Sequence, residues 1–358
     1  MQRPWESAVP GPQGPPSAWS LLPDELEALG CPGHPPSLFG ALQRPWTWQG
    51  GAPRLGRASR AWLEGACDLH LPRIADRAES GDGTVKLALE LADGLRVETV
   101  HMPRDLNHPR VTLCLSSQVG CALGCAFCAT GAMGIQRNLG AGEIVAQVLL
   151  AMTALGPSNP SQLTLVFMGM GEPLHNLEAV HRAIRLLAHP AGLGLPMRRI
   201  TVSTAGLVAG IDRLAGLHPR PWLAVSLNAG TDGLRDQLMP VNRAHPLADL
   251  MAAVRRWKLK PREKLTFEYV LLGGVNDRPA DAEALVQALG EFRHRHNLNL
   301  IPMNAHPGSP FGAPEGDRVE GFAAILKAQG CFVTLRKSRG RDVGAACGQL
   351  VGKAGRDG

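Results

Sequence analysis

The chain has 358 residues, of which 44% are hydrophobic, and it carries a formal net charge of +6 with a sequence pI near 9.0. This length and apolar content exclude disorder along the whole chain and allow a large buried core. The modest positive charge fits a polyanionic partner but identifies none by itself. No apolar run approaches the roughly 20 residues of a membrane-crossing helix, and no secretory signal pattern is present, so we expect a cytoplasmic protein with no membrane partner.

The first hundred residues predict three regions that precede the main fold. Residues 1–22 contain a Pro- and Gly-rich run and are predicted to be a disordered tail. Residues 23–78 show short helical patterns broken by Gly and Pro, which indicates a small helical accessory domain. Residues 79–104 hold two alternating apolar runs around Ala92-Asp93-Gly94, which predicts a linking β-hairpin.

Residues 105–350 alternate between β-rich runs and helical patterns. Helical spacing of apolar residues marks, for example, 142–155, 246–258 and 280–292. Strands are predicted at 111–115, 163–168, 199–203, 222–227, 265–271, 297–301 and 331–335. This alternation predicts an α/β fold with a parallel sheet that forms a full or partial (β/α) barrel, followed by a short tail at 351–358. In such barrels the functional residues gather at the C-terminal ends of the strands.

Three closely spaced cysteines follow the first of these strands, in the sequence Cys121-Ala-Leu-Gly-Cys125-Ala-Phe-Cys128. Three thiolates at this spacing can bind three corners of a 4Fe-4S cluster and leave the fourth iron without a protein ligand. The alternative is zinc, which normally takes four protein ligands in a structural site, and Cys114 is the candidate for the fourth. The spacing favours the 4Fe-4S cluster.

Small and polar residues recur at later strand ends. One strand leads into Met168-Gly-Met-Gly171-Glu172, where glycines let a ligand approach the backbone and a carboxylate can accept hydrogen bonds. Further polar residues follow three later strands, namely Ser203, Ser226, Asn228 and Asn304. Each of these suits an ordinary cap or turn, but their recurrence favours one shared pocket.

A last candidate residue, Cys347, lies near the C-terminus in Ala345-Ala-Cys347-Gly-Gln-Leu. A lone cysteine is usually a small buried hydrophobe. The basic stretch Arg336-Lys-Ser-Arg-Gly-Arg341 precedes it. Such cations can offset phosphate charge, although a solvated charged surface is the commoner meaning of a basic run.

These motifs together resemble the RlmN/Cfr family of radical S-adenosylmethionine RNA methyltransferases. The resemblance covers residues 80–350 and includes the stretch from Cys114 to Cys121, the cysteine triad, Ser203-Thr-Ala-Gly and the segment around Cys347. It departs at Asn228, where the family usually has His, and at residues 339–344, where Arg and Gly stand in place of acidic residues.

The resemblance implies a radical S-adenosylmethionine partial barrel, a 4Fe-4S cluster on the cysteine triad and two molecules of S-adenosylmethionine per turnover. Cys347 matches the residue that becomes S-methylated, Cys114 the residue that resolves the RNA adduct through a disulfide with it, and Glu98 a proton acceptor. The positions that match cofactor contacts are Gly171, Glu172, Ser203, Ser226, Asn228 and Asn304.

The implied substrate is an adenine of 23S rRNA, modified at carbon 2 in an RlmN-like reaction, with tRNA as a further candidate. An electron-donor protein such as flavodoxin or ferredoxin is the implied partner. Two alternatives remain open at this point. One is methylation at carbon 8, as in Cfr-like enzymes, and the other is a non-catalytic iron-sulfur RNA-binding protein.

Overall fold

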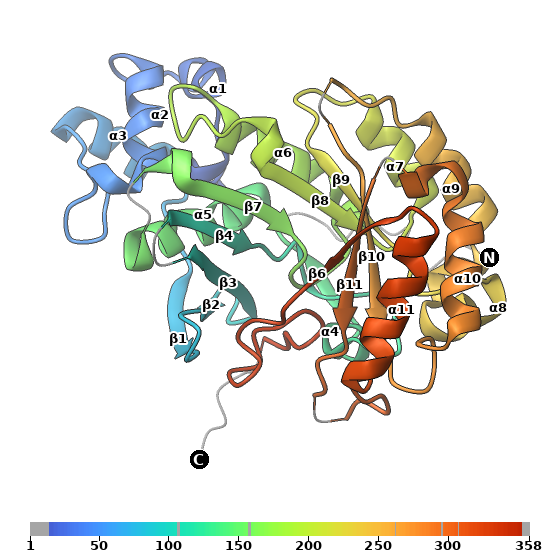
Figure 1. Ribbon diagram of the computed structural model, residues 1–358. Helices are drawn as coiled ribbons and strands as arrows, with labels where there is room; N and C mark the ends of the chain where they lie inside the picture. The colour runs from blue at the N-terminus through green and yellow to red at the C-terminus, as the bar shows by residue number, and fades with distance from the viewer. Residues whose placement is uncertain are drawn as a thin grey trace.

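A computed structural model describes residues 14–105, 108–156, 159–261, 263–294, 296–306 and 308–352. Its centre is a ten-stranded sheet in the order β1-β2-β3-β4-β7-β8-β9-β10-β11-β12 (Figure 1). Neighbouring strands are antiparallel from β1 to β4 and parallel from β4 to β12. The parallel half confirms the predicted α/β fold, and the sheet stays open because β1 and β12 are its two edges.

The parallel strands coincide closely with the seven predicted runs. Their bounds are β4 His108–Cys114, β7 Leu163–Phe167, β8 Ile200–Thr204, β9 Trp222–Ser226, β10 Thr266–Leu271, β11 Asn297–Pro302 and β12 Phe332–Leu335. The central strands are strongly apolar, and Leu163, Leu165 and Phe167 of β7 are buried. Strands covered by helices read as short apolar runs, which is why the sequence located them.

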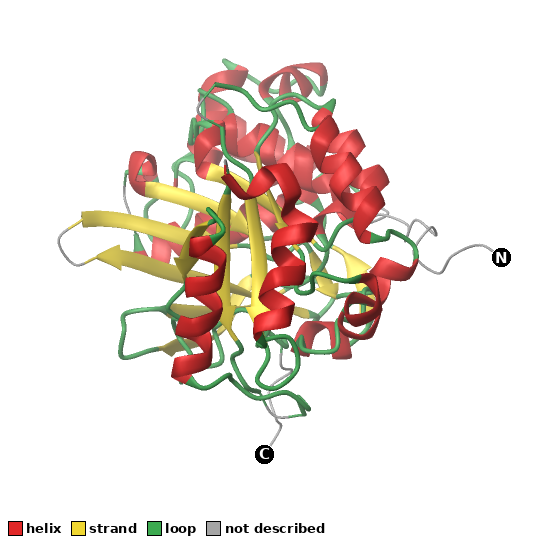
Figure 2. Cartoon of the chain, turned by 45° about the vertical axis from the view of Figure 1, so that its right-hand side comes forward, coloured by secondary structure: helices red, strands yellow, loops and turns green. Residues whose placement is uncertain are grey.

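Helices that follow the parallel strands lie along one face of the sheet (Figure 2). They are α5 Ala141–Leu155, α6 Leu177–Ala188, α7 Val208–Ala215, α8 Asp232–Leu238, α9 Leu247–Arg256, α10 Pro279–Leu289 and α11 Gly316–Ala328. In α6 the buried residues Val180, Ile184 and Leu187 recur at helical spacing and form its apolar face. In the part of the chain that the structure describes, no helix has both the length and the apolar character needed to span a bilayer.

Several short elements complete the fold. A two-stranded sheet pairs β5 Gln118–Gly120 with β6 Ile135–Asn138, and α4 Ala129–Ala132 lies between them in sequence. The 3-10 helices are η1 Ala18–Ser20, η2 Pro45–Thr47, η3 Pro160–Gln162, η4 Pro173–Asn176, η5 Met197–Arg199, η6 Pro240–Arg243 and η7 Gly290–His294.

The N-terminal region contains α1 Pro23–Ala28, α2 Pro35–Gln43 and α3 Arg57–Ala66, grouped beside α5 and α6 (Figure 1). The predicted tail at 1–22 is wrong for residues 14–22. Trp19 in η1 is buried, and its carbonyl oxygen accepts a hydrogen bond of 3.2 Å from Nε2 of Gln43. The apolar residues Trp19, Leu21 and Leu22 supply enough buried surface to hold the segment, despite the prolines before it. Residues 1–13 lie outside the described residues.

The predicted hairpin is present as β2 Val85–Glu90 and β3 Arg96–Asp105. It is an extension of the main sheet, because β3 also pairs with β4. Residues 73–78 fall within the predicted helical accessory domain but belong to the edge strand β1 Arg73–Glu79. Its mostly polar and exposed residues give no alternating apolar pattern, so the sequence does not predict a strand here.

Candidate active site

A pocket lies at the C-terminal ends of β7 to β11 and brings together motifs separated by more than two hundred residues. Nine of the twelve predicted site residues line it, namely Cys121, Cys125, Cys128, Gly171, Glu172, Ser203, Ser226, Asn228 and Cys347. The remaining three, Glu98, Cys114 and Asn304, do not line the pocket. Strand ends of a parallel sheet meet at one edge, which explains this convergence.

The three clustered cysteines sit on a tight loop between β5 and α4. Gly120 begins the loop with a φ of +79°, and a Cβ on it would lie 1.9 Å from the carbonyl oxygen of Gly134, so only glycine fits. The amide of Cys121 donates to that same oxygen at 2.9 Å, and the amide of Cys128 donates to the carbonyl of Cys125 at 3.1 Å. The backbone thus fixes the loop with all three thiols on the pocket wall.

Burial makes these thiols hard to ionise on their own. Loss of solvation raises the pKa of Cys121 to about 12 and raises that of Cys125 further, and charge repulsion from Cys128 adds to both shifts. Bound iron would reverse this effect, since metal ligation stabilises thiolates.

Three thiols spread around a pocket suit a cluster, which is larger than a single ion. Within the described ranges, no group of three or more His, Cys, Asp and Glu side chains could hold one metal ion. Cys114, the fourth ligand in the zinc alternative, is buried at the end of β4 and does not line the pocket. The zinc alternative therefore lacks its fourth ligand at this pocket, and the three cysteines match the ligand set predicted for the iron-sulfur cluster.

Glu172 faces the cysteines from the end of β7. Its carboxylate accepts hydrogen bonds from the amides of Leu174 at 3.0 Å and Ala205 at 2.8 Å. Burial raises the pKa of Glu172 to about 7, and these hydrogen bonds only partly offset the shift. The preceding Gly171 has a φ of +94°, and a Cβ there would lie 2.5 Å from Cβ of Gln118, so the turn needs glycine.

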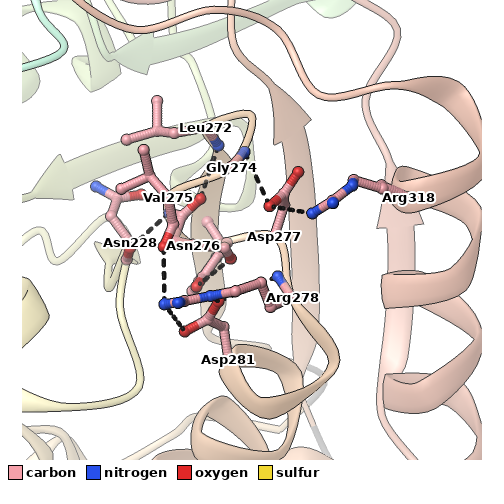
Figure 3. Close-up of polar contacts among 10 residues, drawn as sticks. Asn228, Leu272, Gly274, Val275, Asn276, Asp277, Arg278, Asp281 and Arg318 are labelled. Carbon is pink, nitrogen blue, oxygen red and sulfur yellow. Dashed lines mark hydrogen bonds and ion pairs between the residues drawn. The ribbon is translucent and has the colours of Figure 1, made fainter.

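Asn228 lines the pocket in an unusual backbone conformation, with a φ of +58°. Nδ2 of Asn276 donates to the carbonyl oxygen of Asn228 at 2.9 Å (Figure 3). It also donates to the carbonyl oxygen of Val270 at 2.8 Å. The Asn228 side chain is also engaged, because its Oδ1 accepts from the amide of Val270 and its Nδ2 approaches Sδ of Met239. Asparagine tolerates this left-handed conformation better than most residues.

The segment after β12 brings Cys347 into the pocket that the cysteine loop lines. The amide of Ala129 donates to the carbonyl of Gly348 at 2.8 Å, and Oγ1 of Thr130 donates to that of Leu350 at 2.6 Å. Cys347 itself is exposed where it faces the open pocket. The protein around it nevertheless desolvates the thiol and raises its pKa.

The three predicted residues that do not line the pocket interact with this C-terminal segment, two through polar contacts and one through charge. Nδ2 of Asn304 lies 3.5 Å from the carbonyl of Cys347, and Oε2 of Glu98 accepts from the amide of Val351 at 2.9 Å. Cys114 is buried, and after burial the charge of Cys347 is the largest contribution that raises its pKa. Val351 is the first residue of the predicted tail at 351–358, of which residues 353–358 lie outside the described residues.

The basic stretch before Cys347 divides into two groups. Arg339 is occupied, since its guanidinium donates to the carbonyl oxygens of Pro103 and Arg104. Arg336, Lys337 and Arg341 are exposed. These three remain as candidates for contact with RNA phosphates.

Sequence reasoning missed Glu268, a second carboxylate in the pocket. It lies on β10, is 7% exposed, and accepts a hydrogen bond of 3.2 Å from Oγ of Ser203. Burial raises its pKa. A charged residue inside the apolar run Thr266–Leu271 was the available signal, because an isolated buried charge is costly and is often functional.

The parallel α/β sheet with a cysteine triad at its strand ends defines a radical S-adenosylmethionine enzyme. Residues 115–286 match the model of the Radical SAM superfamily. A crystal structure of a radical SAM methyltransferase from Sphaerobacter thermophilus is similar, with a TM-score of 0.85 and 41% identity over 95% of this chain and 100% of that one.

Curated relatives define the family more narrowly. The chain is 49% identical to the dual-specificity RNA methyltransferase RlmN of Syntrophobacter fumaroxidans, over 84% of this chain and 86% of that protein. It is 45% identical to the RlmN of Anaeromyxobacter sp., over 97% and 93% of the two chains. The chain belongs to the RlmN/Cfr family of radical S-adenosylmethionine RNA methyltransferases, as the sequence motifs predicted. It is therefore an enzyme, and the non-catalytic alternative is wrong.

Proposed function

We propose that this enzyme methylates carbon 2 of adenine in 23S rRNA, with tRNA as a second substrate, through an S-methyl group carried by Cys347. The observation that carries the proposal is that Cys347 shares one pocket with Cys121, Cys125 and Cys128. The dual specificity in the names of the relatives is consistent with two RNA substrates. Such substrates place the reaction in the cytoplasm.

The cysteine triad would hold the 4Fe-4S cluster, and the cofactor contacts would come from Gly171, Glu172, Ser203, Ser226, Asn228 and Asn304. Once bound, the cluster and S-adenosylmethionine supply an electrophilic methyl group and a radical able to abstract hydrogen. Methyl transfer and radical formation each consume one molecule of S-adenosylmethionine, which gives two per turnover. The electron comes from a donor protein of the flavodoxin or ferredoxin class.

Three side chains of the enzyme have proposed roles around the adenine. Cys347 carries the methyl group on sulfur and delivers it to the ring, Glu98 accepts the proton released from the ring carbon, and Cys114 frees the RNA by forming a disulfide with Cys347. Two observations support this division of roles. The charge of Cys347 adds to burial in raising the pKa of Cys114, and Oε2 of Glu98 accepts a hydrogen bond from the amide of Val351, four residues after Cys347.

Nucleoside mass spectrometry of rRNA and tRNA tests the proposal, using cells that lack the endogenous activity and express the wild type or a variant. We expect 2-methyladenosine with the wild type and none with Cys347→Ala or Cys125→Ala. The anaerobically purified wild type should contain about four irons. Cys347→Ala should keep this iron, whereas Cys125→Ala should lose it. Cys67→Ala, in a buried cysteine outside the pocket, is the matched control.

Two results would contradict the proposal. 8-Methyladenosine as the product would show Cfr-like specificity, and an active Cys347→Ala variant would exclude the S-methylcysteine route. Cys114→Ala should accumulate a covalent protein-RNA adduct, visible as a band of reduced mobility on denaturing gels. Release of fully methylated RNA by that variant would remove the resolving role of Cys114.

A further inference from the structure

Glu268 lies on the face of the sheet that forms the pocket. Its register partners are Ser226 on β9 and Asn299 on β11, so the three side chains point to the same side of the sheet. Oγ of Ser203 on β8 reaches across to donate to Oε2 of Glu268 at 3.2 Å. The carboxylate is therefore held among the ends of four neighbouring strands.

The hydrogen-bond partners of Glu268 distinguish it from the other two buried carboxylates of the site. Glu172 binds two backbone amides, and Glu98 binds Lys86 and the amide of Val351. In the described part of the chain, Glu268 forms no salt bridge at contact distance. It accepts hydrogen bonds from the side chains of Ser203 and Asn299, and the charge of Arg336 also favours its ionised form. Burial raises the pKa of Glu268, so its carboxylate takes up a proton more readily than an exposed one.

The neighbour of interest is Cys347, which lines the same pocket. After burial, the charge of Glu268 is the largest cause that raises the pKa of the Cys347 thiol; the charge of Cys128 raises it less, and the charge of Arg336 lowers it. Glu268 also raises the pKa of Cys114. The carboxylate therefore shares a pocket with the thiol that the proposed function methylates, and its charge acts on that thiol.

We propose that Glu268 accepts the thiol proton of Cys347 when that thiol is S-methylated. In this step the S–H bond of Cys347 breaks and its proton moves to the carboxylate. The cysteine sulfur forms a bond to the methyl carbon, and the bond from that carbon to the sulfonium of S-adenosylmethionine breaks, with its electron pair remaining on the departing thioether. Nothing is oxidised or reduced, and the inference rests on the proposed function.

The physical need for such an acceptor follows from the pocket. The thiolate is the nucleophile, and the surroundings of Cys347 disfavour it. In the open pocket the proton can pass to water, but a bound cofactor excludes water from the site. A buried carboxylate in the same pocket then provides the route for the proton.

Methyl transfer to Cys347 can be measured without RNA or reductant. The reconstituted enzyme is mixed with S-adenosylmethionine, and the methylated Cys347 peptide is quantified by mass spectrometry over time. Loss of a positioned base lowers a rate by about 100-fold or more, so we expect that loss in Glu268→Gln and partial recovery in Glu268→Asp. Glu283→Gln, an exposed position on α10, is the matched control and should react like the wild type.

A second measurement needs no cofactor. Alkylation of Cys347 by iodoacetamide, at a fixed pH and without S-adenosylmethionine, should be faster in Glu268→Gln than in the wild type, because removal of the negative charge favours the thiolate. A purely electrostatic role would then also speed methylation, whereas a proton acceptor makes the two rates change in opposite directions.

The outcomes separate this inference from the proposed function. If the wild type gains no methyl group on Cys347, the S-methylcysteine route itself fails. If Glu268→Gln methylates Cys347 as fast as the wild type, or alkylates no faster, only the role of Glu268 is overturned. Iron content and the visible spectrum verify that each variant is loaded. If Glu268→Gln does not retain the cluster, the methylation rate of Glu268→Asp and the rates of alkylation by iodoacetamide test the role of Glu268.

Discussion

Lys86 connects the hairpin to the segment that carries Cys347, and its loss gives a measurable prediction. Its Nζ lies 3.0 Å from Oε1 of Glu98 and 3.3 Å from the carbonyl oxygen of Gly344. The Lys86 and Glu98 side chains are 15% and 4% exposed. Lys86→Met preserves the length of the side chain but leaves the Glu98 carboxylate buried without its cation.

Breaking one partner of a buried ion pair costs about 3–5 kcal/mol, and the partial exposure of Lys86 points to the lower end, about 3 kcal/mol. Unfolding entropy is about 2.1 cal/mol/K per residue, or about 0.75 kcal/mol/K for this chain. The variant should therefore melt about 4 °C below the wild type. Hydrogen exchange at the amide of Val351, which donates to Glu98, should also become faster.

Differential scanning calorimetry and hydrogen-exchange mass spectrometry measure the two effects. Lys327→Met, an exposed lysine on α11, controls for the loss of a positive charge. A Lys86→Met variant that melts with the wild type and protects Val351 equally would refute the idea that the ion pair holds this segment.

Three further changes test the site and its support. Burial raises the pKa of Glu172 from 4.5 to about 7, so the wild type should lose up to about 3 kcal/mol of stability as pH rises from 5 to 8, and Glu172→Gln should not. Urea unfolding of the metal-free proteins at these pH values measures the difference. Equal pH dependence in the wild type and Glu172→Gln would contradict the prediction. Gly171→Ala forces a side chain into a φ of +94° and should weaken S-adenosylmethionine binding in calorimetric titrations, whereas Gly81→Ala, in open space, should not. Glu263→Gln disrupts the buried 2.6 Å pair with Arg220 and should cost about 3–5 kcal/mol in urea unfolding without loss of iron; an unchanged midpoint would contradict this.

Much of the fold could be predicted because the parallel strands are apolar runs between amphipathic helices. The run at 163–168, for example, became β7 at Leu163–Phe167. The cysteine triad was equally visible, because its ligands are close together in sequence and their spacing carries the chemistry. Local patterns thus located both the sheet and one wall of the pocket.

Features that depend on long-range packing were harder to predict. Strand β1 is polar and forms by backbone pairing with β2. Residues 14–22 are held in place because the side chain of Trp19 is buried and its carbonyl oxygen accepts a hydrogen bond from Gln43. Glu268 was missed because only the sheet register brings it toward Ser203 and the segment of Cys347. No pattern along the chain encodes such distances.

Asn228 shows how a departure from the family pattern can be understood from its surroundings. The family usually has His here, and a direct side-chain contact to the cofactor was expected. Both polar atoms of the side chain bond within the protein, to Val270 and Met239. Asn276 donates to the backbone carbonyl of Asn228, which is in the left-handed conformation (Figure 3). Asparagine suits that conformation and bonds locally at the same time. These bonds fix the shape of the wall after β9, from which Asn228 would make its proposed contact with the cofactor.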